Sequence, residues 1–237
     1  LSRAQLLKFL GERPPCVVAM EACASAHHWG RAIGDIGHEV RLIAPAYVKP
    51  FVKRQKNDMA DAEAIAEAAS RPTMRFVAVK SEEQQAAAMV SRTRDLLVRQ
   101  RTQTINALRA HLAEQGIVAP VGPAHVGRLA VIIDGDYGAL PAAVRDLARL
   151  LLDQITGLGE KIAGLDGELR RRASADDTAR RLTTIPGVGP ITAAAITTFA
   201  PPMETFSKGR DFAAWVGLTP RQHSSGGKER LGRTSKM

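Results

Sequence analysis

Three carboxylates in the N-terminal third have the residue types and spacing of a divalent-metal site. Glu21 directly follows the apolar run CVVAM (16–20), at the edge where open α/β sheets carry their sites. Asp58 and Asp61 lie three residues apart at the start of a helical pattern, so they share one helix face. Converging carboxylate oxygens are what Mg²⁺ or Mn²⁺ needs when the ion also holds a phosphate. The alternative is structural: Asp58 caps a helix with Asp61 in its first turn, and Glu21 is only a polar strand end.

A second candidate is the segment RQHSSGGKERLGRTSKM (221–237), where two adjacent serines followed by two adjacent glycines (224–227) stand among five Lys and Arg side chains. Such a segment is a solvated tail, a loop that binds phosphate, or a nucleophile presented to an anionic substrate. The glycines after Ser225 leave the backbone room beside a phosphate. Three cations could offset charge there: Lys228, Arg230 and Arg233. His223 is in no obvious position for a general base, and by composition alone the segment is a flexible basic loop.

The third candidate is a glycine turn in RRLTTIPGVGPITAAAITTFA (180–200). A helix, a Pro-Gly-Val-Gly turn and an Ala-rich helix match the helix-hairpin-helix pattern of DNA binders without sequence specificity. Gly187 and Gly189 would let the backbone approach a phosphate, and the next helix offers free N–H groups and a positive dipole end. The alternative is a tight packing turn between two helices.

The elements that must position these residues alternate in the N-terminal third. Strands are predicted at 16–20, 40–45 and 74–79, and helices at 25–39 and 58–70, from periodicity and β-branched content. A β-α-β unit with a parallel sheet follows. The strands are short, so part of the sheet is expected to be missing from this chain.

Two long helices are predicted beyond this sheet, at 81–116 and 141–172. Their apolar residues recur close to a heptad, which indicates an antiparallel or an intermolecular coiled coil and usually means dimerisation. The Gly- and Pro-rich stretch 116–127 between them is the best domain boundary. Four arginines repeat seven residues apart on expected outer faces of the first helix: Arg92 with Arg99, and Arg94 with Arg101.

Composition limits the class of partner. The 33 Lys and Arg residues exceed the 24 Asp and Glu residues, giving a net charge of +9, so nucleic acid is the expected partner. Cys16 and Cys23 fit no zinc pattern and are expected to be reduced and buried. No apolar run is long enough for a membrane span and no leader is evident, which predicts a cytoplasmic protein.

These pieces occur in a familiar order. VAMEA, RLIAP, KNDMADAEAIAEA, a long helix, IPGVGPITAAAI and FAAWVGLTPRQHSSGGKERLGRTSKM resemble the DEDD-type insertion-sequence transposases, the IS one-ten family related to the Piv invertase. The resemblance covers nearly the whole chain. It implies an RNase H-like domain, similar to a Holliday-junction resolvase, in which four acidic residues bind divalent metal.

The resemblance also implies roles for individual residues. Glu21 would be the second acid of the family, Asp58 the third and Asp61 the fourth, while the first acid lies in an opening strand that this chain is expected to lack. Ser225 would be the nucleophile that attacks DNA, with Ser224 the less favoured neighbour. The expected domains are a truncated RNase H-like domain (1–80), a long-helix coiled-coil region (81–175) and a helical helix-hairpin-helix domain (176–237), incomplete at its C-terminal end.

Members of the family also use a structured noncoding guide RNA, so the resemblance implies RNA as well as DNA as partners, with sequence choice delegated to base pairing. The Arg-rich helix 92–109 would suit an RNA backbone, although a solvated helix face is the alternative. Three further cations would serve in the same way: Lys53, Arg54 and Lys56. Three functions stay open: a recombinase acting through Ser225 and metal, a non-catalytic nucleic-acid-binding remnant, and a Mg²⁺-dependent structure-selective nuclease.

Overall fold

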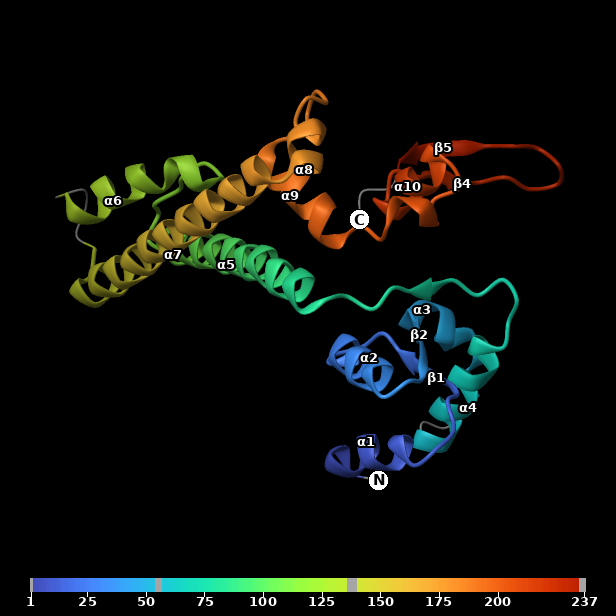
Figure 1. Cartoon of the computed structure of the whole chain (residues 1–237). Coiled ribbons are helices and arrows are strands. Elements are labelled where there is room, and N and C mark those ends of the chain that lie inside the picture. Colours follow the sequence, from blue (N-terminus) through green and yellow to red (C-terminus); the bar gives the residue numbers. More distant parts are fainter. Residues whose placement is uncertain (1, 54–56, 136–139, 235–237) are drawn as a thin grey trace. The chain divides into compact units, whose positions relative to one another are not determined.

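The computed structural model of the chain describes residues 2–53, 57–135 and 140–234 and is mostly helical (Figure 1). Arg54 and Lys56, predicted as RNA contacts, lie outside the described residues. The chain divides into two compact units, one made of Leu1–Val79 with Ala200–Met237 and the other of Lys80–Phe199. Along the described parts of the chain, no helix is both long and apolar enough to cross a bilayer.

The N-terminal segment contains the predicted β-α-β unit. Strand β1 (Val17–Glu21) pairs in parallel with β2 (Glu39–Ile43), and helix α2 (Ala26–Asp35) connects them. The short strand β3 (Phe76–Val77) is antiparallel to β2, which gives the sheet order β1-β2-β3. The parallel pair is therefore confirmed. It fits the sequence because a crossover helix of about ten residues can return the chain to the same edge.

Helix α4 (Asp58–Ala69) closes one small core of this segment. It packs against β1 and β2 and follows α3 (Pro45–Val48) and the short 3₁₀ helix η1 (Lys49–Phe51). The residues buried there are mainly small or aliphatic: Ile43, Val48, Ala64 and Ala68. The alanines of α4 let the helix approach the sheet closely, so the first turn of α4 is held beside the strands.

Helix α1 (Arg3–Gly11) precedes the sheet and was not predicted from the sequence. The buried imidazole of His38 connects it to β1: Nε2 lies 3.0 Å from the Leu10 carbonyl, and Nδ1 accepts from the Cys16 N–H at 3.2 Å. Both cysteines are free thiols, as predicted, but the expectation that they are buried is wrong. Cys16 and Cys23 are exposed, because they lie before and after β1 rather than in the strand itself.

The second unit is built on two long antiparallel helices, α5 (Glu82–Ala113) and α7 (Ala142–Ala175). Ser81 caps α5 by accepting from the Gln84 N–H at 3.1 Å. Leu108 and Leu112 of α5 are fully buried, and Ile155 of α7 belongs to the same core. The apolar faces of α5 and α7 thus pack against each other within one chain. Of the two arrangements that the sequence left open, this is the antiparallel one.

The connection between these helices contains structure that the sequence pattern did not reveal. A 3₁₀ turn η2 (Pro123–His125) leads into α6 (Val126–Asp134), which packs against α7. Leu129 and Ile133 of α6 are buried in the same core as Leu108. The stretch 116–127 interrupts the long helices, as predicted. Residues that follow it, in α6 and α7, belong to the same hydrophobic core as α5.

Two shorter helices complete this unit. Helix α8 (Asp177–Leu182) and helix α9 (Pro190–Phe199) are joined by a tight turn and pack on the C-terminal part of α7. Their shared core is small-residue rich: Leu169, Ala173, Ala179, Ala193 and Ala194.

The C-terminal segment carries a small aromatic cluster and a hairpin. After the 3₁₀ turn η3 (Met203–Thr205), Phe206 packs edge-on against Phe212 and Trp215 of α10 (Gly209–Trp215). Strands β4 (Pro220–Gln222) and β5 (Leu231–Thr234) then pair antiparallel. Residues 221–234 of the basic segment, predicted as a flexible loop by composition alone, therefore lie in a β-hairpin.

Candidate functional site

Ser225 lies at the tip of the β4–β5 hairpin. It bridges to Lys228 across the turn, and the Lys228 N–H donates to the Ser225 carbonyl at 3.1 Å. Gly226 and Gly227 have φ values of +58° and +75°, the left-handed pair that a two-residue type I′ hairpin turn requires. Ser225 is exposed, and across the described residues its hydroxyl has no hydrogen-bond partner. The turn therefore presents a free serine hydroxyl with no side chain on the two residues that follow it.

Ser224, the neighbouring candidate, is held differently. Its Oγ accepts from the Arg230 N–H at 3.0 Å and from Gln222 Nε2 at 2.9 Å, and the residue is half-buried. A hydroxyl oxygen has two lone pairs, so both are engaged. A nucleophile must offer a lone pair to the phosphorus atom, which favours Ser225 over Ser224 on geometry alone.

Two of the three cations predicted beside Ser225 share its face of the hairpin. Lys228 lies directly opposite Ser225, and cross-strand partners share one face. Arg230 is paired with His223, whose N–H donates to the Arg230 carbonyl at 2.8 Å, so both follow on that face. A Cβ on Gly232 would meet the His223 ring at 3.1 Å, which places Gly232 there too. Arg233, the next residue of β5, is exposed, and the shift of register between Pro220 and Gln222 interrupts the alternation of faces there.

The three carboxylates are placed on adjoining elements. Glu21 is the last residue of β1 and half-buried, opposite Ile43 of β2. Asp58 and Asp61 are in the first turn of α4, but neither is the N-cap. Asn57 has that role, since its Oδ1 accepts from the Ala60 N–H at 2.8 Å. The capping interpretation of Asp58 is therefore wrong, and its exposed carboxylate is left without that structural role.

Metal binding needs more than the right donors. Carboxylate oxygens are the ligand type that Mg²⁺ and Mn²⁺ take, so Glu21, Asp58 and Asp61 fit such an ion by chemistry. Within the described ranges, however, no three carboxylate, imidazole or thiol groups converge closely enough to hold a metal. The structure thus places Asp58 and Asp61 on one helical turn and Glu21 at a strand end, but it does not bring the three carboxylates together as a complete metal site.

The predicted glycine turn joins α8 to α9. Gly187 has a φ of +87°, and the Val188 N–H donates to the Ile185 carbonyl at 3.0 Å. Val188 packs into the small-residue core, whereas Gly187 and Gly189 are exposed. One side of the turn therefore anchors it and the other presents bare backbone at the start of α9, where unpaired N–H groups favour an anion.

The four arginines of α5 have different surroundings. Arg94 forms a half-buried ion pair with Asp166 of α7, and Arg101 is also half-buried, so the expectation that these two lie on an outer face is wrong. Arg99 is exposed. Arg92 is exposed as well, with its guanidinium carbon 5.8 Å from the centre of the Phe199 ring. Arg92 and Arg99 are the two that remain free to meet a phosphate backbone.

Lys53 is the one predicted RNA contact near α4 that the structure describes. Its ammonium lies 2.5 Å from the Glu63 carboxylate, and this hydrogen bond raises the pKa of Lys53 above its usual value. The pair is exposed, so solvent and salt weaken it, and Lys53 can exchange Glu63 for a phosphate at little cost.

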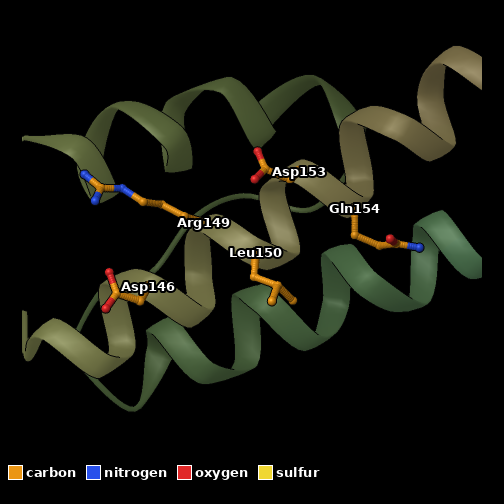
Figure 2. A pocket seen from close by; sticks show the side chains of 5 residues that line it. All are labelled: Asp146, Arg149, Leu150, Asp153 and Gln154. Atoms are coloured by element: carbon orange, nitrogen blue, oxygen red, sulfur yellow. The ribbon is translucent and has the colours of Figure 1, made fainter.

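The depressions on the second unit contain none of the predicted site residues. One, of about 670 Å³, is lined by a single face of α7: Asp146, Arg149, Leu150, Asp153 and Gln154 (Figure 2). In this depression Arg149 forms an ion pair with Asp134 of α6, with Arg149 Nε 2.8 Å from Asp134 Oδ1. A second, of about 370 Å³, lies between the paired ends of α5 and α7 and is mainly apolar. The candidate catalytic residues therefore lie outside both of these depressions.

Sequence reasoning missed Gln222 and the acceptor role of Ser224. Both depend on which side chains share a face of the hairpin, and Gln222 and Ser224 alternate with His223 and Ser225. Recognising SSGGK as a type I′ hairpin, from its two adjacent glycines, would have been the signal that located them.

Comparison with known proteins places both halves of the chain. Residues 2–116 match the DEDD transposase model of the IS110 group, described as "Transposase". Residues 179–237 match the model described as "Transposase IS116/IS110/IS902 family". A DEDD transposase domain implies an RNase H-like fold, and the small sheet with its parallel pair is in keeping with this.

Similar proteins extend over almost all of the chain. A probable family 20 transposase of Pseudomonas aeruginosa is 47% identical over 238 residues, covering 100% of this chain and 70% of that protein. A putative transposase of Sinorhizobium fredii is 48% identical over 232 residues, covering 98% of this chain and 60% of its own length. The transposase of the insertion sequence IS1328 from Yersinia enterocolitica is 48% identical, covering 97% and 68%. This chain thus spans between 60% and 70% of the length of these relatives, and it belongs to the IS116/IS110/IS902 family of DEDD transposases.

Proposed function

We propose that the protein cuts and rejoins DNA strands, with Ser225 as the nucleophile and divalent metal bound by Glu21, Asp58 and Asp61. The observation that carries this proposal is the hairpin tip. A free, exposed serine hydroxyl stands there beside two glycines and opposite Lys228, while the neighbouring Ser224 is fully engaged. Membership of a transposase family supplies the class of reaction.

The proposed step exchanges one phosphate ester for another. The Ser225 Oγ loses its proton and attacks the phosphorus atom of a DNA phosphodiester, and the bond from phosphorus to one deoxyribose oxygen breaks. That oxygen takes up a proton and leaves as a hydroxyl, which balances the proton lost by the serine. Ser225 is then joined to the DNA end as a phosphate diester, so the bond energy is kept for rejoining to another strand hydroxyl. Lys228 and Arg230 lie on the serine's face and would stabilise charge on the pentavalent phosphorus.

The carboxylates would hold Mg²⁺ or Mn²⁺ through Asp58 and Asp61 on the first turn of α4, with Glu21 from the end of β1. A divalent ion supplies charge stabilisation at phosphate oxygens and activation of the attacking or leaving oxygen. Mg²⁺ commonly binds through one or two carboxylates and takes its remaining ligands from substrate phosphates. The absence of a converged cluster among the described residues is compatible with a site that nucleic acid completes.

Two exposed surfaces are proposed to contact nucleic acid. The bare backbone of Gly187 and Gly189 would meet a DNA phosphate, and Arg92 with Arg99 would follow the backbone of a guide RNA. Lys53 would contribute after releasing Glu63. We also propose that the active assembly is a homodimer or a higher oligomer, since rejoining requires two strands to be held together.

A second candidate function is metal-dependent hydrolysis, favoured by the match of residues 2–116 to a DEDD family. In that reaction water attacks the phosphodiester and Ser225 only binds phosphate. A third, non-catalytic binding of nucleic acid, predicts neither adduct nor cleavage.

The test is a search for a covalent protein–DNA adduct. Branched and linear DNA would be incubated with the chain in Mg²⁺ or Mn²⁺, denatured and separated by electrophoresis. We expect an adduct that maps to phosphoserine at residue 225 by mass spectrometry and disappears in Ser225→Ala with DNA affinity retained. Ser207→Ala, an exposed serine of the same segment, is the matched control and should keep the adduct.

The outcomes separate the three functions. Cleavage with free ends and no adduct, unaffected by Ser225→Ala, would establish hydrolysis. Salt-sensitive binding without adduct or cleavage under either metal would leave only a binding role. An adduct that persists in Ser225→Ala would show that another nucleophile acts.

The metal site is tested apart from activity by titrating Mn²⁺ calorimetrically with and without DNA. We expect binding to tighten with DNA and to weaken by at least tenfold in Asp58→Asn and Asp61→Asn, because each variant removes one charged ligand. Asp35→Asn, at the end of α2, should behave as the unmodified chain. Equal affinity in all four proteins would remove these carboxylates from the site.

A further inference from the structure

One bond of the β4–β5 hairpin is made by a side chain where a main-chain group would normally make it. His223 and Arg230 are opposite each other, and the His223 N–H donates to the Arg230 carbonyl at 2.8 Å. In a regular antiparallel pair the two residues return this bond, from the Arg230 N–H to the His223 carbonyl. Here the Arg230 N–H donates instead to the Ser224 hydroxyl oxygen, at 3.0 Å. The strand pairing below the tip therefore depends on Ser224.

The same oxygen receives a second hydrogen bond. Gln222, the last residue of β4, donates its Nε2 to Ser224 Oγ at 2.9 Å. The two donors come from the two sides of the hairpin, one a side chain before the turn and the other a backbone group after it. Ser224 Oγ thus joins both strands at a single point, and we call this set of three residues the serine clip: Gln222, Ser224 and Arg230.

The serine clip lies directly below the turn that carries Ser225. Above it stand only the Ser225–Lys228 bridge and the two glycines, which are the least restrained residues of a chain. Below it, β4 and β5 pair with a shift of register between Pro220 and Gln222. The clip is therefore the last contact between the two strands before the Ser225–Lys228 bridge that carries the tip.

We propose that Ser224 is a positioning residue: it accepts the Gln222 and Arg230 hydrogen bonds and thereby aims the Ser225 hydroxyl at the phosphodiester. The positioning role rests on the proposed function of Ser225, whereas the clip itself does not. This role explains why the site has two adjacent serines. Both lone pairs of Ser224 Oγ accept hydrogen bonds, whereas both lone pairs of Ser225 Oγ are free.

Removing the hydroxyl should loosen the tip without changing any charge. In Ser224→Ala the Arg230 N–H loses its acceptor, and we expect its hydrogen exchange to accelerate about tenfold, the effect of losing one hydrogen bond of ordinary strength. The rate of adduct formation at saturating DNA should fall by about ten- to a hundredfold, since small misplacement of a reacting group has this effect. The DNA concentration that gives half the maximal rate should stay the same.

Ser224→Thr provides the rescue. Threonine keeps the accepting oxygen and suits a strand, so it should restore both the slow exchange of Arg230 and most of the adduct rate. Gln222→Ala removes one donor and should fall between Ser224→Ala and the unmodified protein. Ser207→Ala, outside the hairpin, should leave both measurements unchanged.

The experiment uses the full chain, with exchange followed by NMR and adduct by electrophoresis. Unchanged exchange at Arg230 in Ser224→Ala would overturn the clip. Faster exchange with an unchanged adduct rate would overturn the positioning role, as would an adduct rate that Ser224→Thr does not restore. If the unmodified protein forms no adduct, the proposed function fails and the positioning role with it, but the Arg230 exchange still decides whether the clip exists.

Discussion

Arg94 and Asp166 form an ion pair between α5 and α7 in which most of each side chain is buried, with 23% and 18% exposed. The two residues are 72 positions apart in the chain, so this contact reports directly on the pairing of the two long helices. Removing one partner of such a pair leaves the other poorly solvated and without its counter-charge.

Arg94→Ala is therefore expected to lower the free energy of unfolding by about 1–3 kcal/mol. Chemical denaturation of the whole chain measures this change. Arg99→Ala, an exposed arginine on the same helix, should change stability by less than about 0.5 kcal/mol. Equal losses in the two variants would show that the Arg94 ion pair contributes nothing particular.

Glu168 of α7 gives a prediction for pH. Hydrogen bonds from Arg172 and then Arg171 hold the pKa of Glu168 below its ordinary value of 4.5. A carboxyl whose pKa is lower in the folded than in the unfolded state stabilises the fold above the ordinary pKa, and this is lost as the pH falls through the folded pKa. Glu168→Gln should thus lower the melting temperature slightly at pH 7, and this difference should shrink as the pH falls below 4.5. A difference that grows toward pH 3 would contradict this sign.

At the scale of elements, the turn between α8 and α9 contains two glycines that can be tested separately. Gly187 is needed for the backbone conformation, whereas Gly189 tests contact with DNA. Gly187 has a φ of +87°, which a residue with a Cβ adopts at a cost, whereas Gly189 precedes α9 with open space around it and no positive φ. Serine is favoured at a helix N-cap, so Gly189→Ser keeps the fold while adding bulk at the exposed backbone.

We expect Gly187→Ala to cost about 1 kcal/mol of stability and Gly189→Ser to cost little or none. Both should weaken DNA binding severalfold if the turn contacts a phosphate. Thermal unfolding and a fluorescence binding titration measure the two effects separately. Full DNA affinity in Gly189→Ser would mean that the turn only packs helices together.

At the scale of the whole molecule, the net charge of +9 makes the proposed binding of nucleic acid testable by its dependence on salt. Each phosphate that the protein neutralises adds about 0.9 to the steepness of the decline of log affinity with log salt concentration. For about six contacts, the affinity for duplex DNA should fall by roughly a thousandfold between 50 and 200 mM salt. Arg99→Ala or Arg233→Ala should each reduce the slope by about 0.9 if that side chain contacts a phosphate. An affinity independent of salt would exclude the phosphate backbone as the main contact.

Local patterns in the sequence predicted the elements that short-range forces determine. The β-α-β unit from β1 to β2 and the long helices α5 and α7 lie within a few residues of their expected bounds, because periodicity and capping residues such as Ser81 act over a few positions. Helices α1 and α6 escaped prediction, since each is short and α6 follows a stretch rich in glycine and proline.

The candidate site was predicted residue by residue but not as an arrangement. Family resemblance identified Ser225, Glu21, Asp58 and Asp61, and their types alone indicated the chemistry. The roles of Asn57 as the helix cap and of Ser224 as an acceptor came from the structure, because each depends on one hydrogen bond that several neighbouring residues could have made.

The sequence by itself determined the family, the basic character and the order of the elements, since composition, motif and periodicity are local properties of the chain. Tertiary structure alone decided that α5 and α7 pair within one chain, that Arg94 faces Asp166, and that Ser224 rather than Ser225 is engaged. These contacts form only when groups that are distant in sequence, or on opposite strands, are aligned by the relative register of the two helices or strands. The packing of apolar faces and the twist of a hairpin set that register, and neither is encoded in the identity of a single residue.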